Sequence, residues 1–376
     1  PRLIRNIAIF SLFMVGCKAH TGPHPQARAL VNQGAAYLKQ GNWSRAREAF
    51  KLCLEYTPDY HLCLNGLGNA AWQAGEREEA ARWYRQSIKA NGDFPEARNN
   101  LGAYFLERQT YDRALELFTS ALQIDPGYLD ARYNLAFALV SRVQRNKARG
   151  VDVKKDLDDA EVQLIRLTEL APQRPDARAL LASVYQERAA LVPETAVADN
   201  ERARITIEQC LMAAPAYSDC LVLGAFLSHQ LNRCEEASQR LAELRRLEAD
   251  MSPVKDLEVQ VQSCIAARND QVRRAESNWR DQAARGNMQP LRFLCATFVD
   301  QRNVEKAISY CEEALRQDTD FISTRVTFAR FLVDLQHSQR ALEVCEPVLS
   351  RPRSEDPAGI DACAEITRVL RLGGDR

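Results

Sequence analysis

The 376-residue sequence has few aromatic residues, few glycines and prolines, and no excess of either charge. Only 7% of the residues are aromatic, and 16 glycines with 15 prolines are too few for a β protein rich in turns. Fifty basic and fifty acidic residues cancel, which excludes the basic excess expected of a nucleic-acid binder. Past residue 16 no apolar run reaches the roughly 20 residues that a membrane-spanning helix requires.

The sequence also lacks the motifs of common catalytic and metal sites. It contains no H-E-x-x-H, P-loop, G-x-S-x-G or C-x-x-C, and its five histidines are scattered. Gly66-Leu67-Gly68 imitates part of a dinucleotide fingerprint, but it lies inside a predicted helix and does not follow a strand. We therefore expect no enzymatic activity, no cofactor and no metal.

Residues 1–17 have the pattern of an export signal. The sequence starts at Pro1 without a methionine, so we expect further residues before it. Arg2 and Arg5 precede a short apolar stretch, which ends in Met14-Val15-Gly16-Cys17. This ending resembles the bacterial lipobox, which implies cleavage before Cys17 and attachment of acyl chains to that cysteine. The alternative is a truncated apolar anchor with an incidental cysteine, because Met14 replaces the usual leucine.

Several acyl chains hold a protein stably on a membrane. Residues 18–26 form a short, polar stretch that contains prolines, and we interpret it as a tether. Lys18 directly after the modified cysteine fits sorting to the outer membrane. The expected location is therefore the periplasmic face of the outer membrane, with the lipid as the membrane contact.

From residue 27 the sequence repeats every 34 residues. Small residues, alanines and aromatic residues recur at this spacing: Gly34, Gly68, Gly102 and Ala136; Ala46, Ala80 and Ala114; Phe50, Tyr84 and Phe118. Small residues let two helices approach closely, and proline or glycine ends the second helix. A helix–turn–helix unit with these landmarks resembles the tetratricopeptide repeat.

The resemblance implies an all-α, right-handed superhelix of the α-solenoid type, stabilised by contacts between neighbouring units. We expect about nine helix–turn–helix units and a C-terminal capping helix. Units 1–4 occupy residues 27–174, degenerate units 5–9 occupy 175–355, and the capping helix with the tail occupies 356–376. Insertions of about 12 and 9 residues enlarge units 4 and 5, and residues 251–287 form the most degenerate unit.

Ten of the eleven cysteines fall into pairs when they are placed on the repeat. Adjacent helices bring together Cys53 with Cys63, Cys210 with Cys220, Cys234 with Cys264, Cys295 with Cys311, and Cys345 with Cys363. The remaining cysteine is Cys17. Free buried cysteines are the alternative, since these positions favour small residues. An export signal favours disulfides, because the periplasm is oxidising.

In tetratricopeptide repeats the first helices line a concave groove. The groove positions of units 1–4 carry Asn32, Asn65, Asn69, Asn99, Asn100, Tyr133, Asn134 and Phe137. A row of asparagines can bind the main chain of an extended protein segment, and the two rings add apolar contact. The alternative is that these asparagines bond within the scaffold. Chaperone-tail-binding repeats carry cations where this chain has Val31, Ala35 and Asp130, which disfavours a C-terminal carboxylate as ligand.

Residues 92–106, GDFPEARNNLGAYFL, resemble a segment of the type IV pilus pilotin lipoproteins, the PilF/PilW/Tgl group. That family also joins a lipobox to tetratricopeptide repeats. The resemblance implies an outer-membrane lipoprotein that binds secretin subunits and promotes their assembly into the pilus channel. The alternative is a periplasmic scaffold of another secretion, motility or envelope-assembly complex, with a different protein partner.

Overall fold

The computed structural model describes residues 22–317, 321–352 and 354–373, with side chains up to residue 371. Every regular element in these ranges is a helix, so the prediction of an all-α fold is confirmed. The chain divides into two compact units between Pro172 and Gln173. The expected domain boundary at 174–175 lies close to this division. None of the helices in the described ranges combines the length and the apolar character that crossing a membrane requires.

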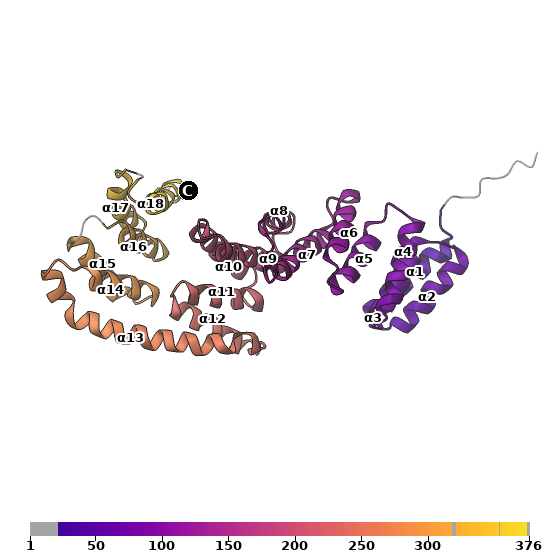
Figure 1. Ribbon diagram of the computed structural model, residues 1–376, viewed down its shortest axis with the longest axis horizontal. Helices are drawn as coiled ribbons and strands as arrows, with labels where there is room; N and C mark the ends of the chain where they lie inside the picture. The colour runs from indigo at the N-terminus through magenta and orange to yellow at the C-terminus, as the bar shows by residue number, and fades with distance from the viewer. Residues whose placement is uncertain (1–21, 318–320, 353, 374–376) are drawn as a thin grey trace, which may run out of the picture. The chain divides into compact units, whose positions relative to one another are not determined.

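Unit 1 is built from four consecutive helix pairs (Figure 1). Each helix packs against its neighbour along the chain, and the first helices of adjacent pairs also touch, as α1 touches α3 and α5 touches α7. The elements are α1 (Pro25–Lys39), α2 (Trp43–Tyr56), α3 (His61–Gln73), α4 (Arg77–Ala90), α5 (Pro95–Glu107), α6 (Tyr111–Ile124), α7 (Leu129–Lys147) and α8 (Lys154–Leu170).

Glycines of the first helices lie against aromatic rings of the second helices. The ring of Phe50 in α2 is placed between Gly34 of α1 and Gly66 of α3, and an added Cβ on Gly34 would lie 2.5 Å from this ring. An added Cβ on Gly102 would lie 2.6 Å from the ring of Phe118. Both rings are buried. The 34-residue landmarks are therefore contacts at which a glycine makes room for a ring.

The turn inside each pair repeats as well. Gly41, Gly75 and Gln109 are spaced by 34 residues, and their φ angles are 72°, 82° and 56°. Glycine adopts this left-handed conformation freely, whereas a residue with a Cβ loses about 1 kcal/mol in it. Arg302 and Gln336 stand at the matching turns of unit 2 with φ angles of 52° and 64°. The geometry of the turn thus persists where the glycine has been lost.

The fourth pair is enlarged at its turn. Helix α7 is 19 residues long, against 13 for α5, and α8 is 17 residues long, against 14 for α6. The connecting loop covers residues 148–153. The insertion expected at this turn therefore lengthens both helices as well as the loop.

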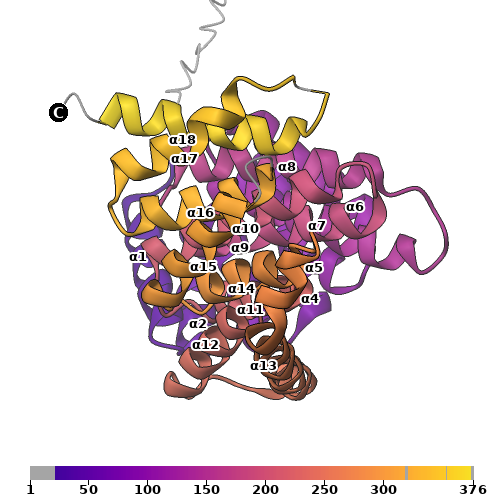
Figure 2. The same ribbon diagram turned by 90° about the vertical axis from the view of Figure 1, so that its left-hand side faces the viewer.

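Unit 2 contains four further helix pairs, a single long helix and a last helix that covers the final pair. Helix α18 packs against both α16 and α17 (Figure 2). The elements are α9 (Pro175–Leu191), α10 (Ala196–Ala213), α11 (Ser218–Gln230), α12 (Cys234–Arg246), the 3-10 helix η1 (Ser252–Val254), α13 (Lys255–Ala284), α14 (Gln289–Asp300), α15 (Val304–Gln317), α16 (Ile322–Asp334), α17 (Ser338–Leu349) and α18 (Pro357–Gly373).

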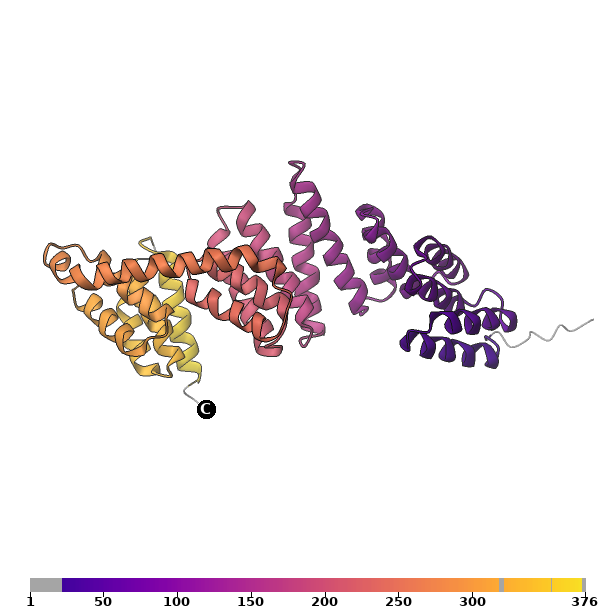
Figure 3. The same ribbon diagram turned by 90° about the horizontal axis from the view of Figure 1, so that it is seen from below.

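The stretch 251–287 differs from the expected degenerate repeat, because most of it, residues 255–284, forms one continuous helix of 30 residues, α13 (Figures 1 and 3). The described residues therefore contain eight helix pairs, where about nine were expected. The first half of α13 packs Leu257 and Val261 against α11 and α12. The second half packs Val272 and Ala275 against the core of α14 to α18. One helix thus joins two hydrophobic cores.

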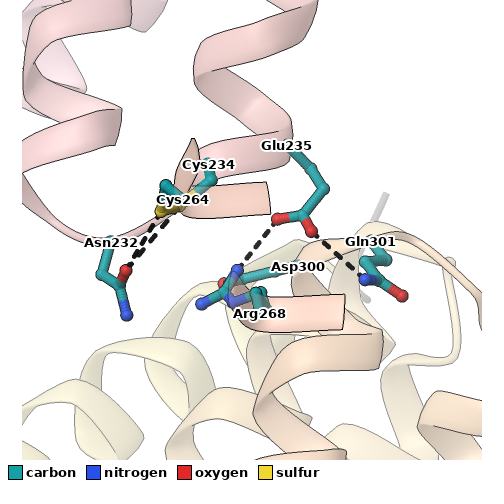
Figure 4. Close-up of a disulfide and its surroundings, with 7 residues drawn as sticks. All are labelled: Asn232, Cys234, Glu235, Cys264, Arg268, Asp300 and Gln301. Atoms are coloured by element: carbon teal, nitrogen blue, oxygen red, sulfur yellow. Dashed lines mark hydrogen bonds and ion pairs between the residues drawn. A yellow bond between two sulfur atoms is a disulfide. The ribbon is translucent and has the colours of Figure 1, made fainter. Parts of the chain in front are cut away.

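Arg268 lies at the middle of α13, between the half of the helix that packs in the first core and the half that packs in the second. Figure 4 shows Arg268 with the residues around it. Its guanidinium Nη1 is 2.9 Å from Oε2 of Glu235 on α12 and 3.2 Å from Oδ2 of Asp300 on α14. Glu235 also accepts a hydrogen bond of 3.2 Å from Gln301. Burial raises the pKa of Asp300, although the positive charge of Arg268 opposes this rise. The buried guanidinium of Arg268 on α13 therefore forms ion pairs with both α12 and α14.

Five disulfides join the ten cysteines of the described residues, with the same partners that the sequence pairs. Three bonds connect successive helix pairs or the cap: Cys53–Cys63, Cys210–Cys220 and Cys345–Cys363. Cys295–Cys311 joins the two helices of one pair, α14 and α15. Cys234–Cys264 attaches α13 to α12, with Cα atoms 6.1 Å apart (Figure 4).

Candidate functional site

The asparagines of the first helices form a network inside unit 1. Nδ2 of Asn100 donates to Oδ1 of Asn65 at 3.0 Å and to Oδ1 of Asn69 at 3.1 Å. The equivalent hydrogen bond recurs one repeat later, where Nδ2 of Asn134 donates to Oδ1 of Asn99 at 2.8 Å. The amide oxygens of three groove asparagines thus already accept bonds from the scaffold, and the network links the first helices of neighbouring pairs.

Two tyrosines extend this network. The hydroxyl of Tyr84 donates to Oδ1 of Asn69 at 3.0 Å. Burial raises the pKa of Tyr128 to about 12, with the negative charges of Glu96 and Asp130 adding to the rise and the Asn99 side chain opposing it. Both hydroxyls therefore stay protonated at neutral pH and act as neutral polar groups.

The other predicted groove residues are more accessible. Asn32 is exposed on α1. Tyr133 and Phe137 lie one turn apart on α7 with their rings stacked at 6.3 Å, and Phe137 is 43% exposed. These side chains offer an amide and an apolar surface to a ligand, while Asn65 and Asn99 are buried. Cys17, the predicted lipidation site, lies outside the described residues.

Gly66 and Gly68, which imitate a dinucleotide fingerprint, lie inside α3. Added Cβ atoms there would meet the rings of Phe50 and Tyr84. These glycines therefore serve helix packing. In the described ranges no group of three or more His, Cys, Asp or Glu side chains has the arrangement of a metal site.

Unit 2 contains a groove that the sequence reasoning missed. It has a volume of about 820 Å³ and lies between α10 and α12 on one side and α14, α16 and α18 on the other. Its apolar wall includes Phe331, Ile366 and Val369, and Val369 is 52% exposed. The volume lies within the range of ligand-binding clefts.

Arginines dominate the polar wall of this groove. Arg240 is held by Glu208 and Glu236, each at 2.7 Å. The hydrogen bonds from Arg204, opposed by burial and helped by the charge of Arg330, keep the pKa of Glu201 below its usual range. Glu201 is therefore ionised and holds Arg204 in place. Arg330 is exposed at the groove.

Comparisons with known proteins agree with this geometry. Models of the tetratricopeptide repeat match residues 27–60 and 65–128. These two segments are tetratricopeptide repeats. An uncharacterised protein of Haemophilus influenzae is 26% identical over 120 residues, which make up 32% of this chain and 66% of that protein.

Two solved structures of pilus proteins are similar to this chain. Pseudomonas aeruginosa pilF is 19% identical, and the match covers 64% of this chain and 97% of pilF with a TM-score of 0.50. PilW, described as a widely conserved type IV pilus biogenesis factor, is 18% identical, and the match covers 64% of this chain and 99% of PilW with a TM-score of 0.49. At this identity the likeness to pilF shows a common fold. The two matched segments are thus repeats of a type that mediates protein–protein interactions.

Proposed function

We propose that this chain is a lipid-anchored periplasmic scaffold of the pilotin type, which binds secretin subunits and promotes their assembly in the outer membrane. One observation carries the proposal: a lipobox ending at Cys17 and the pilotin-like segment 92–106 occur in the same chain. The fold shared with pilF supports it. In this proposal the chain has no catalytic site.

Segment 92–106 has a defined place in unit 1. It forms the turn before α5 and nearly all of that helix, with Pro95 as the first helical residue. Its Asn99 and Asn100 are the members that bond to the asparagines of the adjacent first helices. The segment that resembles pilotins therefore carries the asparagines that link α5 to the first helices on either side, α3 and α7.

We propose that an extended segment of the partner binds along the first helices, on the exposed side chains of Asn32 and Phe137 and the half-buried ring of Tyr133. The rings supply apolar area with few rotatable bonds to fix. The disulfide Cys53–Cys63 joins the first two pairs, which limits the ordering that binding requires. A lipid on Cys17 raises the local concentration at the membrane, so modest contacts suffice.

The proposal is tested on the secretin multimer of the host cell. Unheated outer-membrane samples from wild-type and deletion cells are separated by SDS gel electrophoresis and blotted for the secretin. We expect loss of the multimer and accumulation of the monomer in the deletion strain. An unchanged multimer contradicts the pilotin role.

Two variants test the lipid anchor and the binding surface independently of each other. Cys17→Ala is expected to leave the folded protein in the soluble periplasmic fraction, and retention in the membrane contradicts lipid anchoring. Phe137→Ala is expected to lower secretin multimerisation while the protein stays in the membrane. Val162→Ala on α8 is the matched control, because Val162 is 62% exposed and lies outside the predicted groove.

A second candidate is a scaffold of another envelope complex, and the groove of unit 2 favours it because this groove is a separate place to hold a partner. Val369→Glu is expected to abolish crosslinking of that partner while leaving the secretin multimer unchanged. Val259→Glu is the control, since Val259 is 67% exposed on α13 and does not line the groove.

A further inference from the structure

A second pocket lies in unit 1, at the edge formed by the turns inside the helix pairs. Its volume is about 780 Å³. It is lined by the turn between α5 and α6, the last two turns of α7, the loop 148–153 and the first turn of α8. The enlarged turn of the fourth pair supplies most of this lining. A repeat of 34 residues lacks this extension, so the pocket is particular to the fourth pair. Its lining contains none of the residues predicted for the groove along the first helices.

Two of the three acidic residues of the pocket are paired with one arginine. Arg142 binds Asp156 through Nε at 2.8 Å and Nη2 at 2.7 Å, and it binds Asp112 through Nη1 at 2.7 Å. The hydrogen bonds that Arg142 donates to Asp156 raise the pKa of Arg142, although burial opposes this rise. Oδ1 of Asp152 accepts the backbone N–H of Lys154 at 2.9 Å. Arg142 therefore fixes α6, α7 and α8 together, while the carboxylates of Asp112 and Asp152 stay exposed in the lining.

Four further cations line the pocket, of which Arg108 is paired with Glu78 outside the lining. The other three are Arg145, Arg149 and Lys155. Arg145 donates to the backbone oxygen of Gln109 at 2.8 Å, and its guanidinium lies 5.7 Å from the ring centre of Tyr111. Arg149 is exposed on the loop. The side chain of Lys155 is 89% exposed and pairs with Asp159 at 3.4 Å. The lining therefore has five cations against three carboxylates, which is an excess of positive charge.

Neutral hydrogen-bonding groups accompany these cations. The side-chain amides of Gln109 and Asn146 and the hydroxyl of Thr110 also line the pocket. Amides can pair with both the N–H and the C=O of a peptide, whereas a phosphate offers acceptors only. Guanidinium groups bind carboxylates with two parallel hydrogen bonds. The volume lies within the range of pockets that enclose ligands larger than a single ion.

We propose that this pocket binds an acidic segment of a protein partner, with Arg145, Arg149 and Lys155 contacting its carboxylates. This inference is independent of the pilotin role. It gives the chain a charged docking site at the turn edge, in addition to the apolar surface of Tyr133 and Phe137 on the first helices. Binding at this site weakens as salt rises, because the contacts are solvent-accessible ion pairs.

The test uses the full chain in detergent and a fluorescein-labelled hexaglutamate peptide, with binding followed by fluorescence anisotropy. We expect saturable binding, no binding of labelled hexaglutamine, and about tenfold weaker binding by the variant Arg149→Gln/Lys155→Gln. Both side chains are exposed, so the variant should keep the wild-type circular dichroism spectrum. Arg145→Gln should weaken binding as well.

The matched control is Lys51→Gln/Arg82→Gln, which removes the same charge from exposed positions of α2 and α4. Its affinity for hexaglutamate should equal that of the wild type. Equal weakening by the two double variants would show unspecific attraction and overturn the proposal. Displacement of the peptide by tripolyphosphate at matched ionic strength, as effectively as by unlabelled hexaglutamate, would overturn the assignment to a peptide.

Discussion

Arg188 and Asp199 form a buried ion pair with two parallel hydrogen bonds, Nε to Oδ2 at 3.0 Å and Nη2 to Oδ1 at 2.8 Å. Their side chains are 8% and 0% exposed. The pair links the end of α9 to the first turn of α10, across the enlarged turn of the fifth helix pair. Two charges that solvent does not reach depend on each other for compensation.

Arg188→Met is therefore expected to lower the free energy of unfolding of this region by roughly 3 kcal/mol, because Asp199 loses its buried cation and keeps the longer contact to Arg202 at 3.3 Å and the hydrogen bond of Thr195. Urea unfolding followed by circular dichroism measures the change. Arg166→Met is the control, since the Arg166–Glu169 pair is 57% exposed on both sides, and its loss should cost less than about 1 kcal/mol. Equal effects of both substitutions would contradict the buried role of Arg188.

The same pair predicts a dependence of stability on pH. Burial raises the pKa of Asp199, but the hydrogen bonds and charge of Arg188 lower it more, so the pKa in the folded protein lies below the usual range. A lowered folded pKa stabilises the protein above the unfolded value of about 4, and this stabilisation is lost as the pH falls through the folded pKa. The difference in unfolding free energy between wild type and Asp199→Asn should thus shrink from pH 7 to pH 3. A constant difference would contradict this assignment.

The repeats could be predicted because their contacts are local and periodic. Each landmark, such as Gly102 against Phe118, joins residues of one helix pair, so the spacing along the chain fixes the contact. The cysteine partners followed from the same register, since each bond joins helices that are close along the chain. Spacing alone did not reveal that the amide oxygens of Asn65 and Asn99 accept bonds from neighbouring helices.

Two features escaped the sequence reasoning for different reasons. Residues 255–284 contain neither glycine nor proline, and their buried positions, from Leu257 and Val261 through Arg268 to Val272 and Ala275, keep helical spacing. This signal for one continuous helix was present in the sequence. The groove of unit 2 left no such signal, because it combines side chains from five helices that are far apart in the chain.

Replacing Gly102 tests the packing of the repeats. Gly102→Ala places a Cβ 2.6 Å from the ring of Phe118, which has no room to move in a buried site. We expect a loss of roughly 2 kcal/mol in the free energy of unfolding from this overpacking. Thermal and urea unfolding of the variant measure it.

Gly92→Ala is the matched control, because an added Cβ at Gly92 meets no atom within 4 Å. Its effect should stay within about 0.5 kcal/mol. The variant Gly102→Ala/Phe118→Leu should recover part of the loss, because the smaller side chain makes room for the methyl group. Similar stability of the two alanine variants would contradict the close approach of α5 and α6.

The attachment of α13 leads to a prediction about its disulfide. Cys264 is partly exposed, whereas the other nine cysteines in the described disulfides are at most 1% exposed. A dilute thiol reagent followed by an alkylating agent should therefore modify Cys264 and its partner Cys234 before any other pair, because the attacking thiolate must reach a sulfur atom. Mass spectrometry of the digested protein identifies the modified cysteines. Earlier modification of Cys295 and Cys311 would contradict this order.

Reduction of this bond should leave α13 in place, because Arg268, one turn beyond Cys264, holds the helix to Glu235 of α12 and Asp300 of α14. Hydrogen exchange of residues 255–284 should rise little in Cys234→Ser/Cys264→Ser. It should rise strongly when Arg268→Met is added, since the helix then loses both the disulfide and the ion pair to α12 and leaves two half-buried carboxylates without this cation. Each change alone removes one attachment, so the combined effect should exceed the sum of the two. Simple additivity would show that the hydrophobic contacts of Leu257, Val261, Val272 and Ala275 hold α13 by themselves.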